Sequence, residues 1–194
     1  MRGKTILTYL TMAIFYVGCG DSYETKINEY WENRKDFFKK HDESPFIATG
    51  STFDTLNYYS PNKKFRVNAS YEVIKPVERI AIPTSTGDYR TYTKYARAKF
   101  ELGGEQQTLL LLKREEGGEQ LFLPFYDQTS ARETYGGGRY LDLEEPFGNR
   151  IIIDFNYAYY PYCAYDIDYS CPLPPSINRI SVAVKAGEKD VNQQ

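Results

Sequence analysis

The chain of 194 residues has one histidine, one tryptophan and three cysteines, and these shortages exclude several kinds of site. His41 stands far along the chain from Cys163 and Cys171, so these residues do not form a zinc-binding set, and we expect no metal. A single histidine without a Gly-x-Ser-x-Gly sequence gives no pattern for a Ser-His-Asp triad. No Gly-Lys-Ser or Gly-Lys-Thr follows the three glycines at 136–138, which excludes a P-loop there, and we expect no cofactor.

An excess of positive charge is also missing. Without residues 1–18 the chain has 22 basic residues against 26 acidic ones, so nucleic acid is not an expected partner. No alternation of strands with helices appears, which argues against a doubly wound nucleotide-binding sheet. Aromatic residues, by contrast, are abundant: the chain has 19 Tyr and 11 Phe. Tyrosine favours strands and half-buried surfaces.

The N-terminus has the features of an export signal. Arg2 and Lys4 precede a short apolar run from Ile6 to Val17, too short for a membrane span of about 20 residues but suited to a signal peptide. We therefore predict a signal peptide over 1–18, a junction over 19–21, one globular domain over 22–190 and a disordered tail over 191–194.

The residues at the end of this run, Gly18-Cys19-Gly20-Asp21, resemble the lipobox of bacterial lipoproteins. The resemblance implies lipidation at Cys19 and attachment to a membrane of the bacterial cell envelope, with the domain facing the periplasm or the cell surface. Ordinary secretion is the alternative, because Tyr16 and Val17 differ from the usual residues. If Cys19 carries lipid, Cys163 and Cys171 remain as a disulfide candidate, which would stabilise the fold by about 2–3 kcal/mol.

Two periodicities predict the fold. Apolar residues at helical spacing predict an amphipathic helix over about residues 22–40. From Phe65 onward the period changes to two, which predicts seven or eight strands. We expect them near 65–73, 77–83, 89–102, 107–114, 119–126, 139–143, 150–156 and 178–186. The expected fold is a mainly β (α+β) antiparallel barrel or sandwich with one N-terminal helix.

Unusual residues concentrate in two stretches. One contains Arg-Glu-Thr-Tyr-Gly-Gly-Gly-Arg-Tyr-Leu-Asp-Leu from Arg132 to Leu143. The other contains Asp-Phe-Asn-x-Ala-Tyr-x-Pro-x-Cys-Ala-Tyr from Asp154 to Tyr165, followed by Cys-Pro-Leu-Pro-Pro from Cys171 and by Ala-Gly-Glu-Lys ending at Lys189. Over roughly residues 120–190 these runs resemble the family catalogued as domain of unknown function 1684. The resemblance implies a fold but brings no activity with it.

The residues themselves leave several interpretations open. Three consecutive glycines favour either a tight bulge or a backbone cradle for an anion. The arginines beside them either hold a ligand carboxylate or phosphate, or pair with acids inside the domain. The tyrosines of 157–169 form either a groove for a glycan or a packed loop. The candidate ligand-binding residues are Arg132, Glu133, Tyr135, Arg139, Asp154, Asn156, Tyr159 and Tyr165.

Three functions follow from these candidates. The first is a lipid-anchored, non-catalytic binding module with a polar and aromatic pocket for a small polar ligand or a glycan. The second is a hydrolase in which Asp154 or Glu133 acts as general base and an arginine stabilises negative charge. The third is a structural or assembly role in the envelope, with the motif residues acting only to hold the fold together.

Overall fold

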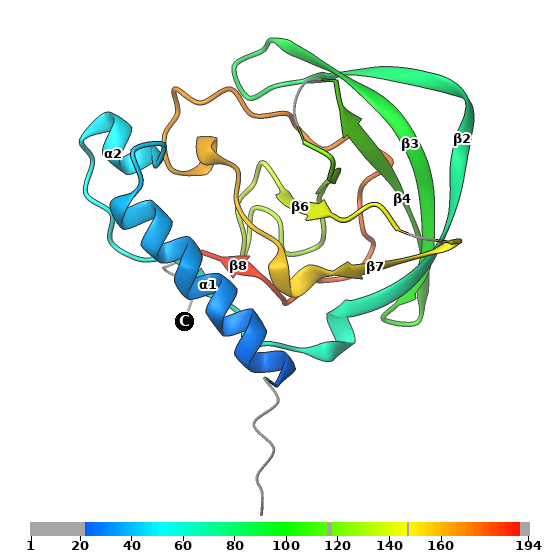
Figure 1. The fold of residues 1–194 in the computed structure, drawn as a ribbon, viewed down its shortest axis with the longest axis horizontal. Helices are drawn as coiled ribbons and strands as arrows, with labels where there is room; N and C mark the ends of the chain where they lie inside the picture. The colour runs from blue at the N-terminus through cyan, green and yellow to red at the C-terminus, as the bar shows by residue number, and fades with distance from the viewer. Residues whose placement is uncertain (1–21, 116–117, 147, 191–194) are drawn as a thin grey trace, which may run out of the picture.

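The computed structural model describes residues 22–115, 118–146 and 148–190, so the predicted signal peptide, Cys19 and the predicted tail lie outside the described residues. The predicted fold class is confirmed: eight strands in antiparallel sheets form a half-barrel, with the helical region at the N-terminus. In Figure 1 the long curved strands β2, β3 and β4 form one side of the molecule, and helix α1 lies on the opposite side.

The predicted helix is present as α1, Tyr23–Lys40, with Ser22 as its N-cap: the Ser22 side chain accepts a hydrogen bond from the Thr25 N–H. A second, short helix, α2, spans Pro45–Thr49. The buried stripe of α1 includes Ile27, Trp31 and Phe38. Its aromatic residues serve packing, because the Trp31 ring stacks on Tyr58 with centroids 4.5 Å apart.

The main sheet has six strands in the order β6-β5-β4-β3-β2-β7. Their bounds are β2 Arg66–Pro83, β3 Tyr89–Leu102, β4 Glu105–Arg114, β5 Leu121–Phe125, β6 Arg139–Leu143 and β7 Arg150–Asp154. A second sheet pairs β1, Asn57–Tyr58, with β8, Glu188–Lys189. Short 3-10 helices η1 (Lys63–Phe65), η2 (Phe155–Tyr157) and η3 (Tyr162–Ala164) complete the elements of the described residues. The concave face encloses the main apolar core, which includes Leu109, Leu123 and Ile153.

Two expectations about strands were wrong. The segments 65–73 and 77–83 belong to one strand, β2, whose pairing with β3 shifts register between Val73 and Glu78. The segment 178–186 is not a strand: Ile180, Val184 and Ala186 are buried as alternation predicts. However, the carbonyl oxygens of Val184 and Ala186 accept hydrogen bonds from an arginine side chain and not from a neighbouring strand.

Asn178 holds the sheet together where its pairing is weakest. β4 and β5 share one register pair in the described residues, Leu112 with Phe122. The buried Asn178 side chain accepts a hydrogen bond from the Leu110 N–H at 2.6 Å and donates to the carbonyl oxygens of Leu110 and Pro124 at 2.9 and 2.8 Å. The amide thus replaces ladder hydrogen bonds that the diverging strands cannot make.

Candidate functional site

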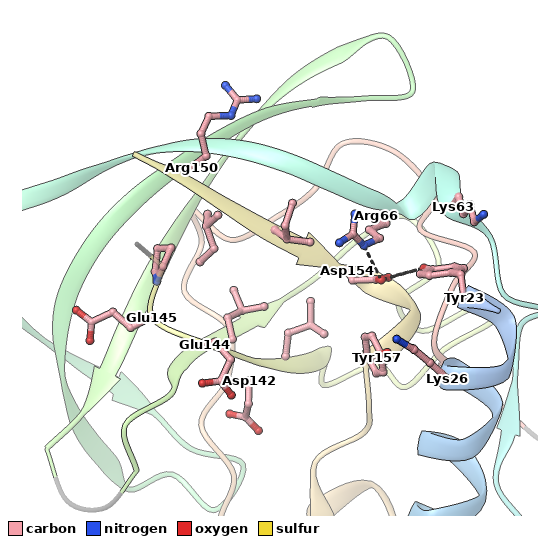
Figure 2. A pocket seen from close by; sticks show the side chains of 15 residues that line it. Tyr23, Lys26, Lys63, Arg66, Asp142, Glu144, Glu145, Arg150, Asp154 and Tyr157 are labelled. Atoms are coloured by element: carbon pink, nitrogen blue, oxygen red, sulfur yellow. Dashed lines mark hydrogen bonds and ion pairs between the residues drawn. The ribbon is translucent and has the colours of Figure 1, made fainter. Parts of the chain in front are cut away.

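The half-barrel is open between its two edge strands, β6 and β7, and this opening is the candidate site. β6 pairs only with β5, and β7 only with β2, among the strands that the structure describes. A cavity of about 900 Å³ lies along the opening, and Figure 2 shows the side chains that line it. We call it the β6–β7 cleft.

The two ends of the cleft are closed by the chain itself. At one end the chain leaves β6 at Leu143 and enters β7 at Arg150. At the other end Tyr140 and Tyr159 exchange two backbone hydrogen bonds, of 2.9 and 3.1 Å. The opening between the two strands is therefore a short, partly open groove.

The floor of the cleft is apolar. Leu141, Leu143 and Ile151 line it and also belong to the main core, in which each is at most 6% exposed. Ile152, also on the cleft, keeps 39% of its surface exposed. The cleft therefore offers a ligand apolar surface next to the interior of the half-barrel.

Positive charge gathers at the end of the cleft next to α1. Lys26 from α1, Lys63 from η1 and Arg66 from β2 lie around Asp154 at the end of β7 (Figure 2). Arg66 Nε lies 3.6 Å from Asp154 Oδ2, and the Tyr23 hydroxyl donates to both Asp154 oxygens at 3.0 and 2.9 Å. Three cations and one carboxylate thus line this end of the cleft, which gives it a net positive charge.

Burial, together with the hydrogen bond to Asp154, raises the pKa of Tyr23 above its usual value. Tyr23 therefore stays protonated and donates at neutral pH. The Lys63 ammonium lies 5.5 Å from the centroid of the Tyr23 ring, which places Lys63 beside the tyrosine that donates to Asp154.

Acidic residues line the other part of the cleft, and they already have cationic or amide partners. Arg114 Nη2 donates to Asp142 Oδ1 at 2.8 Å, and Lys113 Nζ donates to Glu145 Oε2 at 2.6 Å. The hydrogen bond from Lys113 lowers the pKa of Glu145. These carboxylates are less available to a ligand than the lysines at the opposite end.

Arg139, a predicted ligand-binding residue, lies inside the protein. Its Nη2 contacts Asp127 Oδ2 at 2.7 Å, and both side chains are 1% exposed. The guanidinium also donates to the carbonyl oxygens of Val184, Ala186 and Glu188. Of the two interpretations that the sequence left open, these contacts match the pairing of the arginine with an acid inside the domain. They also tie β6 to the segment that leads into β8.

The neighbouring charges face a different surface. Glu133 pairs with Lys185 at 2.9 Å and accepts a hydrogen bond from the Tyr59 hydroxyl at 3.1 Å. The hydrogen bond from Lys185 lowers the pKa of Glu133, so that carboxylate is a weaker proton acceptor than an ordinary glutamate. Arg132 is exposed. Neither Arg132 nor Glu133 lines the β6–β7 cleft.

The three glycines form a tight turn. The Gly138 N–H donates to the Tyr135 carbonyl at 3.1 Å, and Gly138 has φ +87°. A side chain at Gly138 would meet the Phe125 carbonyl oxygen at 2.7 Å and Pro174 Cγ at 2.8 Å. Close packing accounts for the glycine at this position.

Asn156 and three tyrosines among the candidates have partners inside the protein. Asn156 is fully buried and donates to the Tyr23 hydroxyl and the Asn62 carbonyl at 2.8 and 3.0 Å. The hydroxyl groups of the three tyrosines also donate to groups of the protein. Tyr135 donates to the Cys163 carbonyl at 3.4 Å, Tyr159 to Asp142 Oδ2 at 2.5 Å, and Tyr165 to Glu188 Oε1.

Of the eight predicted ligand residues, all within the described part of the chain, Asp154 alone lines the β6–β7 cleft. Sequence reasoning missed Tyr23, Lys26, Lys63 and Arg66. These residues come from a helix, a 3-10 turn and a strand, and no local spacing indicates that they line one cleft with Asp154.

Cys163 and Cys171 lie side by side but are not bonded in this structure. The Cys163 N–H donates to Cys171 Sγ at 3.1 Å. A hydrogen bond with Cys171 lowers the pKa of Cys163 to about 6, and the same hydrogen bond raises the pKa of Cys171. Cys163 is thus the thiol that ionises first.

Fold and cleft together define a β half-barrel domain with an N-terminal helix packed beside its open edge. The chain belongs to the family described as "Protein of unknown function (DUF1684)", whose sequence pattern matches residues 51–189. No curated protein matches the chain. The solution NMR structure of the uncharacterized protein from gene locus rrnAC0354 of Haloarcula marismortui is similar, with 34% sequence identity and a TM-score of 0.68. The similarity covers 89% of this chain and 96% of that one.

Proposed function

We propose that the domain is a non-catalytic binding module of the bacterial cell envelope and that the β6–β7 cleft holds a small amphipathic anion. One observation carries the proposal: one end of an apolar-floored cleft is lined by three cations, of which only Arg66 is paired with a carboxylate of the described residues. Such a combination suits a molecule with a carboxylate or phosphate at one end and an aliphatic body.

Lys26 and Lys63 are the residues that the ligand would engage. Among the described residues neither lysine has a carboxylate within 4.0 Å, whereas Arg66 is already held by Asp154. A ligand anion would therefore gain charge-assisted hydrogen bonds without first breaking an ion pair. Leu141, Leu143 and Ile152 would contact its aliphatic part.

The test is titration calorimetry of the purified protein with octanoate, octyl phosphate and the uncharged octyl glucoside. We expect the two anions to bind and the glucoside to bind at least about tenfold more weakly, since it lacks the charge-assisted contacts. Lys26→Gln and Lys63→Gln should each weaken anion binding by about tenfold. Lys99→Gln, an exposed lysine on β3 outside the cleft, is the matched control and should have no effect.

Two results would contradict this assignment. One is the absence of anion binding at millimolar concentration. The other is equal affinity of the Lys26→Gln, Lys63→Gln and Lys99→Gln variants. Preferential binding of short glycans, unaffected by both cleft lysines, would favour the glycan-groove interpretation instead.

Export and lipidation at Cys19 remain part of this proposal and rest on the sequence. Helices in the described ranges do not combine the length and apolar character needed to cross a bilayer. Expression of the full chain with a Cys19→Ala substitution should move the protein from the membrane fraction to the soluble fraction. The intact mass of the membrane-bound form should include diacylglycerol and acyl chains. A mature protein without lipid mass would refute the anchor.

We also propose that Cys163 and Cys171 form a disulfide once the protein is exported. The 3.1 Å contact between the Cys163 N–H and Cys171 Sγ supports this, because it places the Cys171 thiol next to the Cys163 backbone. Non-reducing mass spectrometry should find the mass lower by two hydrogen atoms than after reduction. Complete alkylation of both thiols without prior reduction would exclude the bond.

A further inference from the structure

A second pocket, of about 330 Å³, lies between α1 and the loop of residues 159–172. Its walls are largely aromatic, and we call it the tyrosine pocket. The tyrosines that line it are Tyr140, Tyr159, Tyr162 and Tyr169. It shares no lining residue with the β6–β7 cleft.

The charged residues of the tyrosine pocket all have one sign. Arg34 and Arg90 line it, and no aspartate or glutamate is among its lining residues. In a domain whose acids outnumber its bases, two guanidinium groups facing one small cavity are an anion-binding arrangement.

Arg34 is held in a fixed orientation. Its guanidinium carbon lies 4.5 Å from the centroid of the Tyr159 ring and 4.9 Å from that of Phe38, and Nη2 donates to the Tyr160 carbonyl at 3.2 Å. Its Nε, 3.8 Å from Glu188 Oε2, has no hydrogen-bond partner in the described residues. A planar group fixed in this way loses little entropy when it binds an anion.

Arg90 lies on the other side of the pocket, at the start of β3. Its Nη2 donates to the Ser170 carbonyl at 2.7 Å, which leaves the other guanidinium donors for a ligand. Tyr162 and Tyr169 contact each other edge to face, with centroids 5.3 Å apart, and offer flat apolar surface within the same cavity.

We infer that the tyrosine pocket binds a small organic acid with a planar, aromatic body. The carboxylate would pair with Arg90, the ring would pack on the tyrosines, and Arg34, already paired with Glu188, would form the cationic wall opposite. The volume lies at the lower end of the range for ligand sites, which restricts the ligand to about one ring.

The probe is 4-hydroxybenzoate, with the uncharged 4-hydroxybenzamide, acetate and inorganic phosphate as comparisons, measured by calorimetry on the purified protein. We expect 4-hydroxybenzoate to bind at least about tenfold more tightly than each of the three. Arg90→Gln should weaken its binding by about tenfold. Arg90 is exposed, so the substitution should not disturb folding. Arg97→Gln, an exposed β3 arginine outside the pocket, should bind like the unaltered protein.

The cleft and the tyrosine pocket are separable in this experiment. Lys63→Gln should leave 4-hydroxybenzoate binding unchanged, and Arg90→Gln should leave octanoate binding unchanged. Loss of 4-hydroxybenzoate binding in Lys63→Gln would place the acid in the cleft and overturn the inference. Equal binding of the amide, tighter binding of phosphate or acetate, or equal affinities of Arg90→Gln and Arg97→Gln would overturn it as well.

Discussion

Arg139 and Asp127 form an ion pair in the interior of the half-barrel, with Nη2 and Oδ2 separated by 2.7 Å and both side chains 1% exposed. Arg139 is the first residue of β6, and Asp127 follows the end of β5. The same guanidinium binds three carbonyl oxygens between Val184 and Glu188. One side chain therefore fixes the segment that would otherwise need a neighbouring strand.

Arg139→Met should lower the free energy of unfolding by about 3–5 kcal/mol, because it leaves Asp127 buried and unpaired. Urea denaturation followed by circular dichroism measures the change. Lys40→Met is the control, since Lys40 and Asp36 form an exposed pair whose loss costs at most about 0.5 kcal/mol. A difference below about 1 kcal/mol between the two variants would show that the buried pair does not stabilise the fold.

Gly138→Ala should destabilise the protein more than Gly87→Ala, although the two glycines have φ +87° and +88°. At Gly87 a methyl group meets nothing within 4 Å, so the only cost is that of placing alanine in a left-handed backbone conformation, about 1–2 kcal/mol. At Gly138 the methyl group collides with the Phe125 carbonyl oxygen and Pro174, which adds about 1–3 kcal/mol. Thermal unfolding of the two variants side by side measures the difference. Equal melting temperatures would argue against close packing at the turn.

Asn178→Ala should cost at least about 2 kcal/mol, because three backbone groups on β4 and β5 lose their hydrogen bonds inside the protein. Hydrogen exchange should speed up most at the Leu110 amide, which donates to Asn178 Oδ1. Gln106→Ala, on the exposed face of β4, should change little. Unchanged protection at Leu110 would contradict the role given to Asn178.

In the reduced protein, Cys163 should react with iodoacetamide faster than Cys171 from about pH 6 upward. The pKa of Cys163 is lowered to about 6, so its reactive thiolate is present above that pH and is lost as the pH falls through it. Peptide mass spectrometry assigns the modified residue at each pH. Cys171→Ser removes the hydrogen bond that lowers this pKa, and the midpoint should then rise. A midpoint near 9 in the unaltered protein would refute the prediction.

The alternation of apolar and polar residues predicted a strand correctly where one face of that strand packs on the core and the other faces solvent. The alternation around Val67 and Ala69 predicted β2 because these residues face the core and their neighbours face solvent. The same alternation at Ile180 and Val184 was misleading: the Ile180 N–H donates to the Tyr126 carbonyl beside a single isolated bridge, and the Val184 carbonyl accepts from Arg139, so neither residue lies in a ladder. Alternating burial shows which face of a segment is covered, but it does not show whether the backbone groups of that segment bond to a neighbouring strand or to a side chain.

The sequence by itself determined the helix Tyr23–Lys40, the β-rich fold class and most of the main sheet, because these depend on the spacing of apolar residues along short segments. Only the tertiary structure decided that Arg139 turns inward to Asp127, and that Lys26, Lys63 and Arg66 line the same cleft as Asp154. Those positions depend on which strands become the edges of the half-barrel and on how the chain packs around them, and both are set by contacts between residues far apart in the chain.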